Sequence, residues 1–359
     1  ILLVLLSLFF SFGLMADDTT DDSTKKATKD ESKEESKKDD RELISEFVEE
    51  FITYEGLLKS YQDPENGNTY IELSDEDISK EFIYFAHIIN GTVEAGLFKG
   101  SHIDQAVIKF EKQFNSLNLV RVNTEYYFDP DSELSRQSQS NISDSVIENF
   151  EITHKNEDEN TYLIDITKLL KSDNLTKLKS EPRDYESDSF GVGSLSRSKT
   201  AISKIYNYPN NTDFEVDYVF SNPASYESLR NTSVKLRYTF LEMPQDNGFE
   251  IRFEDPRIGY FTDRVTDLSS TEITPYRDLV QKWNLQKQNP DAAKSKPIKP
   301  IKFWLENTTP NELRPLIKNA VLAWNIAFEK AGFIDAIEVD VQPDDADWDA
   351  GDILSLIHI

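Results

Sequence analysis

The sequence contains no cysteine, and its four histidines are His87, His102, His154 and His358. Without cysteine, the chain can form neither a disulfide framework nor the thioether that anchors an exported protein to lipid. The motif H-E-x-x-H is absent from the 359 residues, and so is G-x-S-x-G. The first absence excludes a zincin-type metal helix in this chain, and the second excludes the nucleophile elbow of many hydrolases. We therefore assign no catalytic residue and no metal ligand within this chain.

Basic residues are few, with 39 Lys and Arg against 66 Asp and Glu. The resulting net charge of −27 argues against nucleic acid and anionic membrane surfaces as partners. Hydrophobic residues make up 38% of the chain and aromatic residues 11%, which is enough to form a substantial core. The length indicates two or three domains. The sequence gives no indication of the oligomeric state.

The first 42 residues divide into an apolar run and a polar stretch. Residues 1–16 read ILLVLLSLFFSFGLMA, which has the length of the apolar region of a signal peptide whose start is truncated. Residues 17–42 are rich in Asp, Glu, Lys, Ser and Thr and predict a disordered, solvated linker. We expect export to the periplasm or the exterior, with cleavage near Ala16 and no membrane anchor left afterwards.

Residues 43–80 predict a small module made of a helix and a hairpin. Apolar residues recur at helical spacing from Leu43 to Ile52, and the helix should end before Gly56. Two short apolar runs, 57–61 and 69–73, then flank the turn-rich sequence DPENGN at 63–68. This arrangement is typical of a β-hairpin.

Residues 81–280 predict a β-rich domain. The strands are expected over 82–89, 106–113, 117–128, 162–166, 205–208, 214–220 and 232–243, with a tight turn at 114–116. In the last of these strands the alternation places four apolar residues on one face and three polar residues on the other. The apolar face comprises Val234, Leu236, Tyr238 and Phe240, and the opposite face Lys235, Arg237 and Thr239.

Residues 297–353 predict a strand, a helix, a strand and the approach to a third strand. Thr309 and Glu312 have the spacing of a capping box, and Pro310 suits the first helical position. Gly332 suits the left-handed position after the helix, and residues 337–341 alternate as a half-buried strand.

An apolar stripe about five turns long runs through the helix predicted from Thr309 to Ala331. Its members are Leu313, Leu316, Ile317, Ala320, Val321, Trp324, Ala327, Phe328 and Ala331. The stripe predicts that Trp324 points at the sheet. Pro315 lies inside the pattern, so we expect a distorted first turn there.

Three segments of this region carry a resemblance to a known family. They are KPIKFWLENTTP, which contains Trp304; AWNIAFEKAGF; and PDDADWDAGDI, which contains Asp347, Trp348 and Asp352. Together they resemble the start of the peptidase domain of secreted bacterial zinc-dependent metalloproteases of the metzincin type. The two preceding regions resemble the two N-terminal modules of unknown function in that family, so the resemblance covers about residues 43–353.

The resemblance implies an α+β protein whose last part begins a zincin-like peptidase domain with a β-α-β unit. In the family, three histidines of a later H-E-x-x-H-x-x-G-x-x-H motif bind Zn²⁺ and the glutamate activates the water that cleaves a peptide bond. Those ligands are not present here, so we interpret the chain as an N-terminal fragment that is itself inactive. Residues 354–359 depart from the family pattern, and we interpret them as a sequence artefact.

Five carboxylates cluster near the end of the chain. Asp344, Asp345, Asp347, Asp349 and Asp352 could bind Ca²⁺, although their spacing is not that of an EF-hand. A solvated acidic turn leading into the next strand is the favoured interpretation. In the family, Gly351 and Asp352 enter the strand nearest the substrate cleft, which implies a positional role for them.

Other isolated residues favour structural interpretations. His87 lies in the apolar run FIYFAHII and is expected in the core, whereas His102 and His154 are expected in solvent. Residues 255–257, Asp-Pro-Arg, predict a turn in which Arg257 can pair with Asp255. Because residues 43–280 show no catalytic cluster, the alternative function is a non-enzymatic exported β-rich binding or assembly protein.

Overall fold

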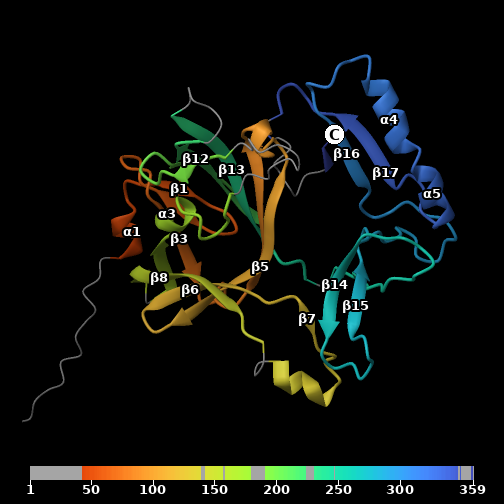
Figure 1. The fold of residues 1–359 in the computed structure, drawn as a ribbon, viewed down its shortest axis with the longest axis horizontal. Coiled ribbons are helices and arrows are strands. Elements are labelled where there is room, and N and C mark those ends of the chain that lie inside the picture. The colour runs from red at the N-terminus through yellow and green to blue at the C-terminus, as the bar shows by residue number, and fades with distance from the viewer. Residues whose placement is uncertain are drawn as a thin grey trace, which may run out of the picture. The chain divides into compact units, whose positions relative to one another are not determined.

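The computed structural model describes residues 43–138, 142–156, 158–178, 191–223, 230–245, 247–346, 348 and 357–358. The predicted signal peptide and linker lie outside this range, as do Asp347, Asp349, Asp352 and residues 354–356 and 359. The described chain is rich in strands and has few helices (Figure 1). The prediction of a β-rich middle domain is therefore confirmed at this level.

Within the described residues, twelve strands form the main sheet, and all of their pairings are antiparallel. Along the sheet the order is β1 (Ile52–Tyr54), β2 (Ser60–Gln62), β3 (Thr69–Ser74), β9 (Thr161–Asp165), β8 (Ser145–Asn156), β6 (Ser116–Arg121), β5 (His102–Gln113), β4 (Glu81–Asn90), β13 (Asn231–Glu242), β12 (Asn211–Ser221) and β10 (Ser194–Leu195). β11 (Ala201–Tyr208) also pairs with β12. Between strands lie the short helices α1 (Ile44–Phe47), η1 (Val93–Ala95), η2 (Glu133–Gln137) and α3 (Thr167–Leu170).

The two ends of this sheet meet where the segment between β1 and β2 passes along β11. The Asn207 side-chain amide donates to the backbone oxygens of Tyr54 at 2.8 Å and Leu58 at 2.7 Å, and the Leu57 N–H donates to the Tyr208 carbonyl at 2.8 Å. A Cβ atom on Gly56 would lie 2.1 Å from Asn207 Oδ1 and 2.8 Å from its backbone carbonyl carbon. Glycine is therefore required at this contact.

One hydrophobic core fills the inner side of the sheet. It receives alternate residues from the strands, among them Tyr84 and Ile88 of β4 and the four residues of β13 that were predicted to share one face. Tyr218 of β12 is the polar centre of this core. Its single hydroxyl proton lies within reach of the backbone oxygens of Leu170 at 2.6 Å and Ser172 at 3.0 Å, and the hydroxyl lies 2.7 Å from that of Tyr238.

Most strands predicted in the β-rich region are present, but one prediction is partly wrong and several strands were not predicted. The strand predicted over 117–128 ends early, because β6 stops at Arg121, and residues 126–127 form β7 (Tyr126–Tyr127) in another sheet. The sequence analysis missed β8, whose register shifts opposite β6 and β9 interrupt a simple alternation. Arg237 and Thr239 lie on the outer face of β13 as predicted, yet both are buried.

Residues 43–80 share their sheet with the strands that follow. β2 and β3 pair around the 63–68 loop, and β3 also pairs with β9. The helix predicted from Leu43 to Ile52 is much shorter, because α1 covers only four residues and Ile52 already begins β1.

A second sheet has the order β15 (Tyr276–Val280), β14 (Thr262–Asp267) and β7. β14 and β15 form an antiparallel pair, and residue 253 adds an isolated bridge on the outer edge of β15. The sequence analysis did not predict these two strands.

A third sheet lies in the C-terminal part of the chain, with β16 (Ile301–Leu305) in its centre. β17 (Ile337–Val341) and the backbone of β18 (Ile357–His358) pair with it in parallel. Between β16 and β17 the chain forms α4 (Arg314–Leu322) and α5 (Asn325–Lys330), which pack on one side of the strands (Figure 1). Among the helices that the structure describes, none has both the length and the apolar character needed to cross a bilayer.

The start of the helix differs from the prediction. α4 begins at Arg314 after Leu313, without a side-chain cap, so Thr309 and Glu312 do not form the predicted capping box. Pro315 lies in the first turn of α4 rather than distorting a helix already formed. Proline is tolerated there because the N–H groups of the first helical turn have no acceptor within the helix. The N–H that proline lacks therefore costs no helical hydrogen bond.

The end of the helix agrees with the prediction. Gly332 has φ +96°, and its N–H donates to the Glu329 carbonyl at 3.1 Å, while the Phe333 N–H donates to the Phe328 carbonyl at 2.9 Å. These two bonds form a Schellman motif, which ends α5.

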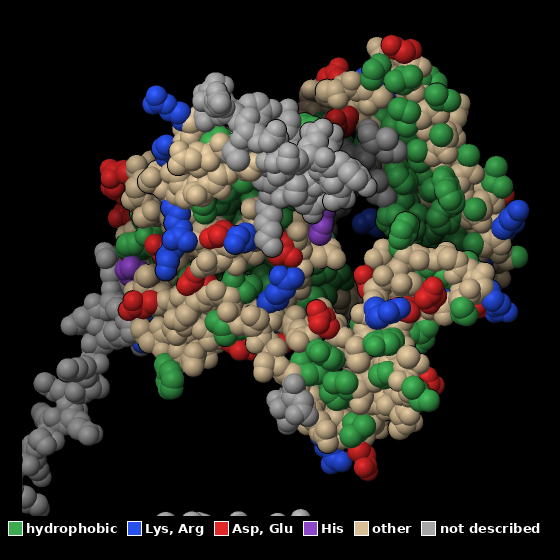
Figure 2. All heavy atoms as spheres, viewed as in Figure 1, with side chains coloured by type: hydrophobic (Ala, Val, Ile, Leu, Met, Phe, Trp, Pro, Cys, Tyr) green, Lys and Arg blue, Asp and Glu red, His purple; other side chains and the backbone are tan. Residues whose placement is uncertain are grey.

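The prediction that Trp324 points at the sheet is wrong, because 65% of the surface of this residue is exposed. The chain between α4 and α5 uses bonds from residue i to i−3, including Trp324 N–H to the Val321 carbonyl at 3.2 Å. Such bonds give three residues per turn, so the stripe of α4 is not continued in line through α5. Ile317, Val321 and Phe328 pack against the sheet. Figure 2 shows the hydrophobic side chains left exposed over α4 and α5.

We predict that Trp324→Ala lowers the free energy of unfolding by less than about 1 kcal/mol, because the side chain is largely exposed. Leu305→Ala is the control: this side chain is fully buried in β16, so its removal should cost about 2–5 kcal/mol. Urea unfolding followed by circular dichroism measures both. A cost for Trp324→Ala that equals that of Leu305→Ala would show that Trp324 is buried.

From the buried tyrosines of the core we predict that the chain loses stability at alkaline pH. Burial is the main cause that raises the pKa of Tyr84, Tyr218 and Tyr238 far above 10, and burial together with a hydrogen bond to Glu72 raises the pKa of Tyr61 to about 12. Because the unfolded chain ionises near pH 10, the stability from these groups is complete below that pH and is lost as the pH rises further.

Absorbance at 295 nm across a pH titration measures this effect. We expect the four buried tyrosines to ionise only as circular dichroism reports unfolding, and Tyr218→Phe to remove one late-titrating group. Ionisation of every tyrosine near pH 10 in a still folded chain would contradict the prediction.

Candidate functional site

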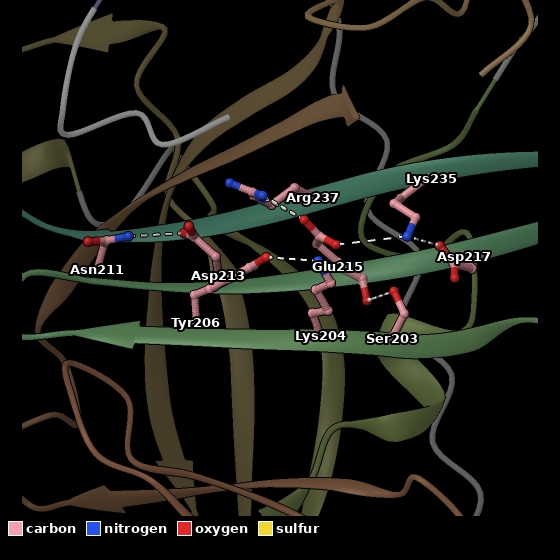
Figure 3. Close-up of polar contacts among 9 residues, drawn as sticks. All are labelled: Ser203, Lys204, Tyr206, Asn211, Asp213, Glu215, Asp217, Lys235 and Arg237. Carbon is pink, nitrogen blue, oxygen red and sulfur yellow. Dashed lines mark hydrogen bonds and ion pairs between the residues drawn. The ribbon is translucent and has the colours of Figure 1, made fainter. Parts of the chain in front are cut away.

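Among the described residues, buried polar side chains gather most densely on the outer face of β11, β12 and β13 (Figure 3). We call these buried side chains and the more exposed polar side chains that contact them the polar row: Ser203, Lys204, Tyr206, Asn211, Asp213, Glu215, Asp217, Lys235 and Arg237. The four members from β12 are alternate residues, so they share one face while Phe214, Val216 and Tyr218 enter the core.

The central contact of the polar row is the ion pair between Arg237 and Glu215. The strand register places the two residues directly opposite each other. Arg237 Nη2 lies 2.6 Å and Nε 3.2 Å from Glu215 Oε1, and the two side chains are only 1% and 3% exposed. The Arg237 guanidinium also lies 5.0 Å from the ring centre of Tyr206. The aromatic face and the carboxylate together hold the buried cation.

The other contacts extend this pair along the strands. Lys235 Nζ lies 3.2 Å from Asp217 Oδ1 and 4.0 Å from Glu215 Oε2 (Figure 3). On β11, Lys204 donates to the Tyr206 hydroxyl at 3.2 Å, and this bond raises the pKa of Lys204.

The polar row is balanced in charge. Three carboxylates, Asp213, Glu215 and Asp217, lie among three cations, Lys204, Lys235 and Arg237. In the part of the chain that the structure describes, no three metal-binding side chains are arranged to hold a metal ion. This arrangement is that of a structural ion network, which fixes the register of β11, β12 and β13 because a slip by one residue would bury the charges in the core. The alternation D-F-E-V-D in residues 213–217, opposite Lys235 and Arg237, is the sequence signal that could have revealed it.

The residues that carry the family resemblance are only partly brought together. The Trp304 ring on β16 lies 5.1 Å from the Trp348 ring, and Lys302 Nζ lies 4.6 Å from the Trp304 ring. Phe328 joins the small core under α5. Thr309 is half-buried and Glu312 is exposed, both ahead of α4.

The histidines agree with the predictions in two cases and differ in one. His87 is buried on β4, and His102 is exposed. His154 is not in open solvent as predicted, because its ring stacks on Phe47 of α1 at 4.0 Å. The side chain of His358 lies outside the described residues.

The two candidate turns lie on the surface. Asp344 and Asp345 are exposed in a turn after β17. The predicted pair at 255–257 is confirmed, with Arg257 Nε 2.8 Å from Asp255 Oδ1 and the Ile258 N–H bonded to the Asp255 carbonyl at 2.9 Å. The hydrogen bonds from Arg257 lower the pKa of Asp255.

We predict that Arg237→Met destabilises the chain by about 3–5 kcal/mol, because it leaves the buried Glu215 carboxylate without its main cation. The double variant Arg237→Met with Glu215→Leu should recover much of this loss. Arg264→Met is the matched control, because Arg264 is 62% exposed in its pair with Asp278 and should cost under about 1 kcal/mol. Urea unfolding of the four proteins gives the comparison. Equal costs for Arg237→Met and Arg264→Met would refute the buried-pair interpretation.

The comparison with known families concerns the part of the chain that holds the polar row. Residues 100–288 match the family described as a domain of unknown function, DUF5117. The match runs from the start of β5 to beyond β15, so it includes the polar row and both strands of the β14–β15 hairpin. No curated protein and no solved structure matches the chain. Because the matched residues make up more than half of the sequence, the chain belongs to the DUF5117 family.

Proposed function

We propose that this chain is the N-terminal part of an exported zinc-dependent metalloprotease, in which the β-rich DUF5117 region precedes the peptidase domain. The observation that carries the proposal is the unit formed by β16, α4, α5 and β17. Its two strands are parallel, and the helices connect them. This unit is built from the segments that resemble the start of a metzincin peptidase domain.

Local contacts in that unit support the proposal. Asn325, in the segment AWNIAFEKAGF, donates to the Ile337 carbonyl at 3.0 Å and accepts from the Ile337 N–H at 2.9 Å. The side chain thus ties the first turn of α5 to the beginning of β17. Gly332 in the same segment ends the helix. Two neighbouring parallel strands need a crossover connection, here through α4 and α5. Gly332 ends the last helix of this connection, and Asn325 holds that helix against the second strand.

The described residues do not provide a zinc site, because no three potential ligands among them are suitably arranged. We therefore assign no step of peptide hydrolysis to a residue of this chain. The chain would contribute the first β-α-β unit of the catalytic domain, and Zn²⁺ would be held by the family's H-E-x-x-H-x-x-G-x-x-H motif. The apolar run at residues 1–15 supports export, and a peptide or protein would be the substrate.

The reading frame downstream of codon 353 tests this proposal. We expect it to continue into H-E-x-x-H-x-x-G-x-x-H. The complete protein should then cleave casein, lose this activity to a zinc chelator and regain it with Zn²⁺, whereas residues 43–359 alone should neither cleave casein nor bind one Zn²⁺ per chain. A stop codon in the natural gene, or stoichiometric zinc on the 43–359 protein, would count against the proposal.

A second candidate function is that of an exported β-rich binding protein. The observation that favours it is a cleft of about 490 Å³ beside β14 and β15, within the matched region. A genuine stop after codon 353, together with ligand binding in this cleft, would favour this function over the first.

A further inference from the structure

The cleft beside β14 and β15 has two walls. The first wall is the segment before β14, and the second is formed by the end of β14, the following loop and the start of β15. The lining residues are Phe253, Glu254 and Pro256 on the first wall, and Asp267, Ser270, Glu272, Thr274, Pro275, Tyr276, Arg277 and Asp278 on the second. We call it the β14–β15 cleft.

An ion pair between the buried Asp267 and the partly exposed Arg277 lies in the lining of the cleft. Asp267 is fully buried and accepts from the Ser269 N–H at 3.0 Å, from the Ser269 hydroxyl at 2.5 Å and from Arg277 Nε at 2.5 Å. Although burial opposes ionisation, these hydrogen bonds lower the pKa of Asp267. The Arg277 guanidinium also lies 5.3 Å from the Tyr127 ring centre and 5.1 Å from that of Phe253. Arg277 is therefore already paired with a carboxylate and two rings.

The lining carries more negative than positive charge, with four carboxylates and one guanidinium. Two of the carboxylates are neutralised: Asp267 by Arg277, and Asp278 by Arg264, whose Nε lies 2.8 Å away. The remaining two, Glu254 and Glu272, are exposed, and neither lies within ion-pair distance of a cationic side chain among the described residues. Asp278 raises the pKa of Arg264, Glu254 is close enough to add to this effect, and the Arg264 guanidinium lies 5.1 Å from the Tyr276 ring centre. Glu254 and Glu272 leave the lining of the cleft with a net negative charge that a cation can neutralise.

Apolar surface surrounds these two carboxylates. Phe253 is 48% exposed and Tyr276 is 53% exposed, and Ile273 beside the cleft is fully exposed. Figure 2 shows exposed hydrophobic side chains over the part of the molecule that contains β14 and β15. Aromatic faces next to carboxylates suit the alkyl stem and the charged head of lysine or arginine. Contiguous exposed apolar surface is also typical of interaction sites.

We propose that the β14–β15 cleft docks a basic peptide segment of another protein. One lysine or arginine head would lie between Glu254 and Glu272, and neighbouring apolar side chains of the segment would pack on Phe253 and Tyr276. A second copy of this chain is a poor occupant, because two copies that each carry a charge of −27 repel each other. The proposal does not depend on metalloprotease activity.

Fluorescence anisotropy of short labelled peptides tests the proposal on the 359-residue chain. The probe is Ala-Phe-Arg-Phe-Ala, and the comparison peptides replace its arginine with glutamine or with glutamate. We expect only the arginine peptide to bind, and to bind more weakly as ionic strength rises. Equal binding of the glutamate peptide would overturn the proposal, and so would binding of none of the three.

The matched variants separate the cleft from general attraction to an acidic protein. Glu254→Gln with Glu272→Gln should weaken binding of the arginine peptide about ten-fold or more. The control pair, Glu65→Gln with Glu312→Gln, removes two exposed carboxylates elsewhere and should change binding by less than about two-fold. All four side chains are exposed, so circular dichroism and thermal unfolding should remain those of the parent chain. Equal weakening by both pairs would show non-specific attraction and overturn the proposal.

Discussion

The closing contact between the two ends of the main sheet is the constraint on which the β-rich region depends. The Asn207 side chain donates to the backbone oxygens of Tyr54, at the end of β1, and of Leu58, just before β2, and Gly56 allows the two segments to approach. Without this contact, the ends would present free strand edges and the core would open to water. The short strands β1 and β2 are therefore held by a residue about 150 positions later in the chain.

On β12, near that contact, both faces of the strand carry side chains that pack or pair with neighbouring strands. The inner face of β12 supplies aromatic residues to the core, where the Tyr218 hydroxyl lies within hydrogen-bond distance of the Leu170 and Ser172 carbonyls. The outer face supplies the acidic members of the polar row, of which Glu215 and Asp217 pair with cations of β13. Because a one-residue slip would exchange the two faces, the apolar core and the polar row favour the same register.

The proposed functions belong to two different parts of the chain. The resemblance to a peptidase lies in the unit around β16, which has its own small core. The matched family region contains the β14–β15 cleft, whose lining includes the exposed carboxylates of Glu254 and Glu272. A cleft that recognises basic segments would give the β-rich region a role of its own, whichever activity the C-terminal part supports.

The sequence by itself determined the local features. The alternation in β13, the 114–116 turn, the glycine that ends α5 and the Asp255–Arg257 pair all follow from neighbouring residues, whose spacing fixes their geometry. Tertiary structure decided the rest. Trp324 is exposed because a tighter turn interrupts the stripe, His154 is covered by Phe47, and the cleft joins residues 253–256 to residues 267–278. Such contacts depend on which segments meet in space, and no local pattern encodes that.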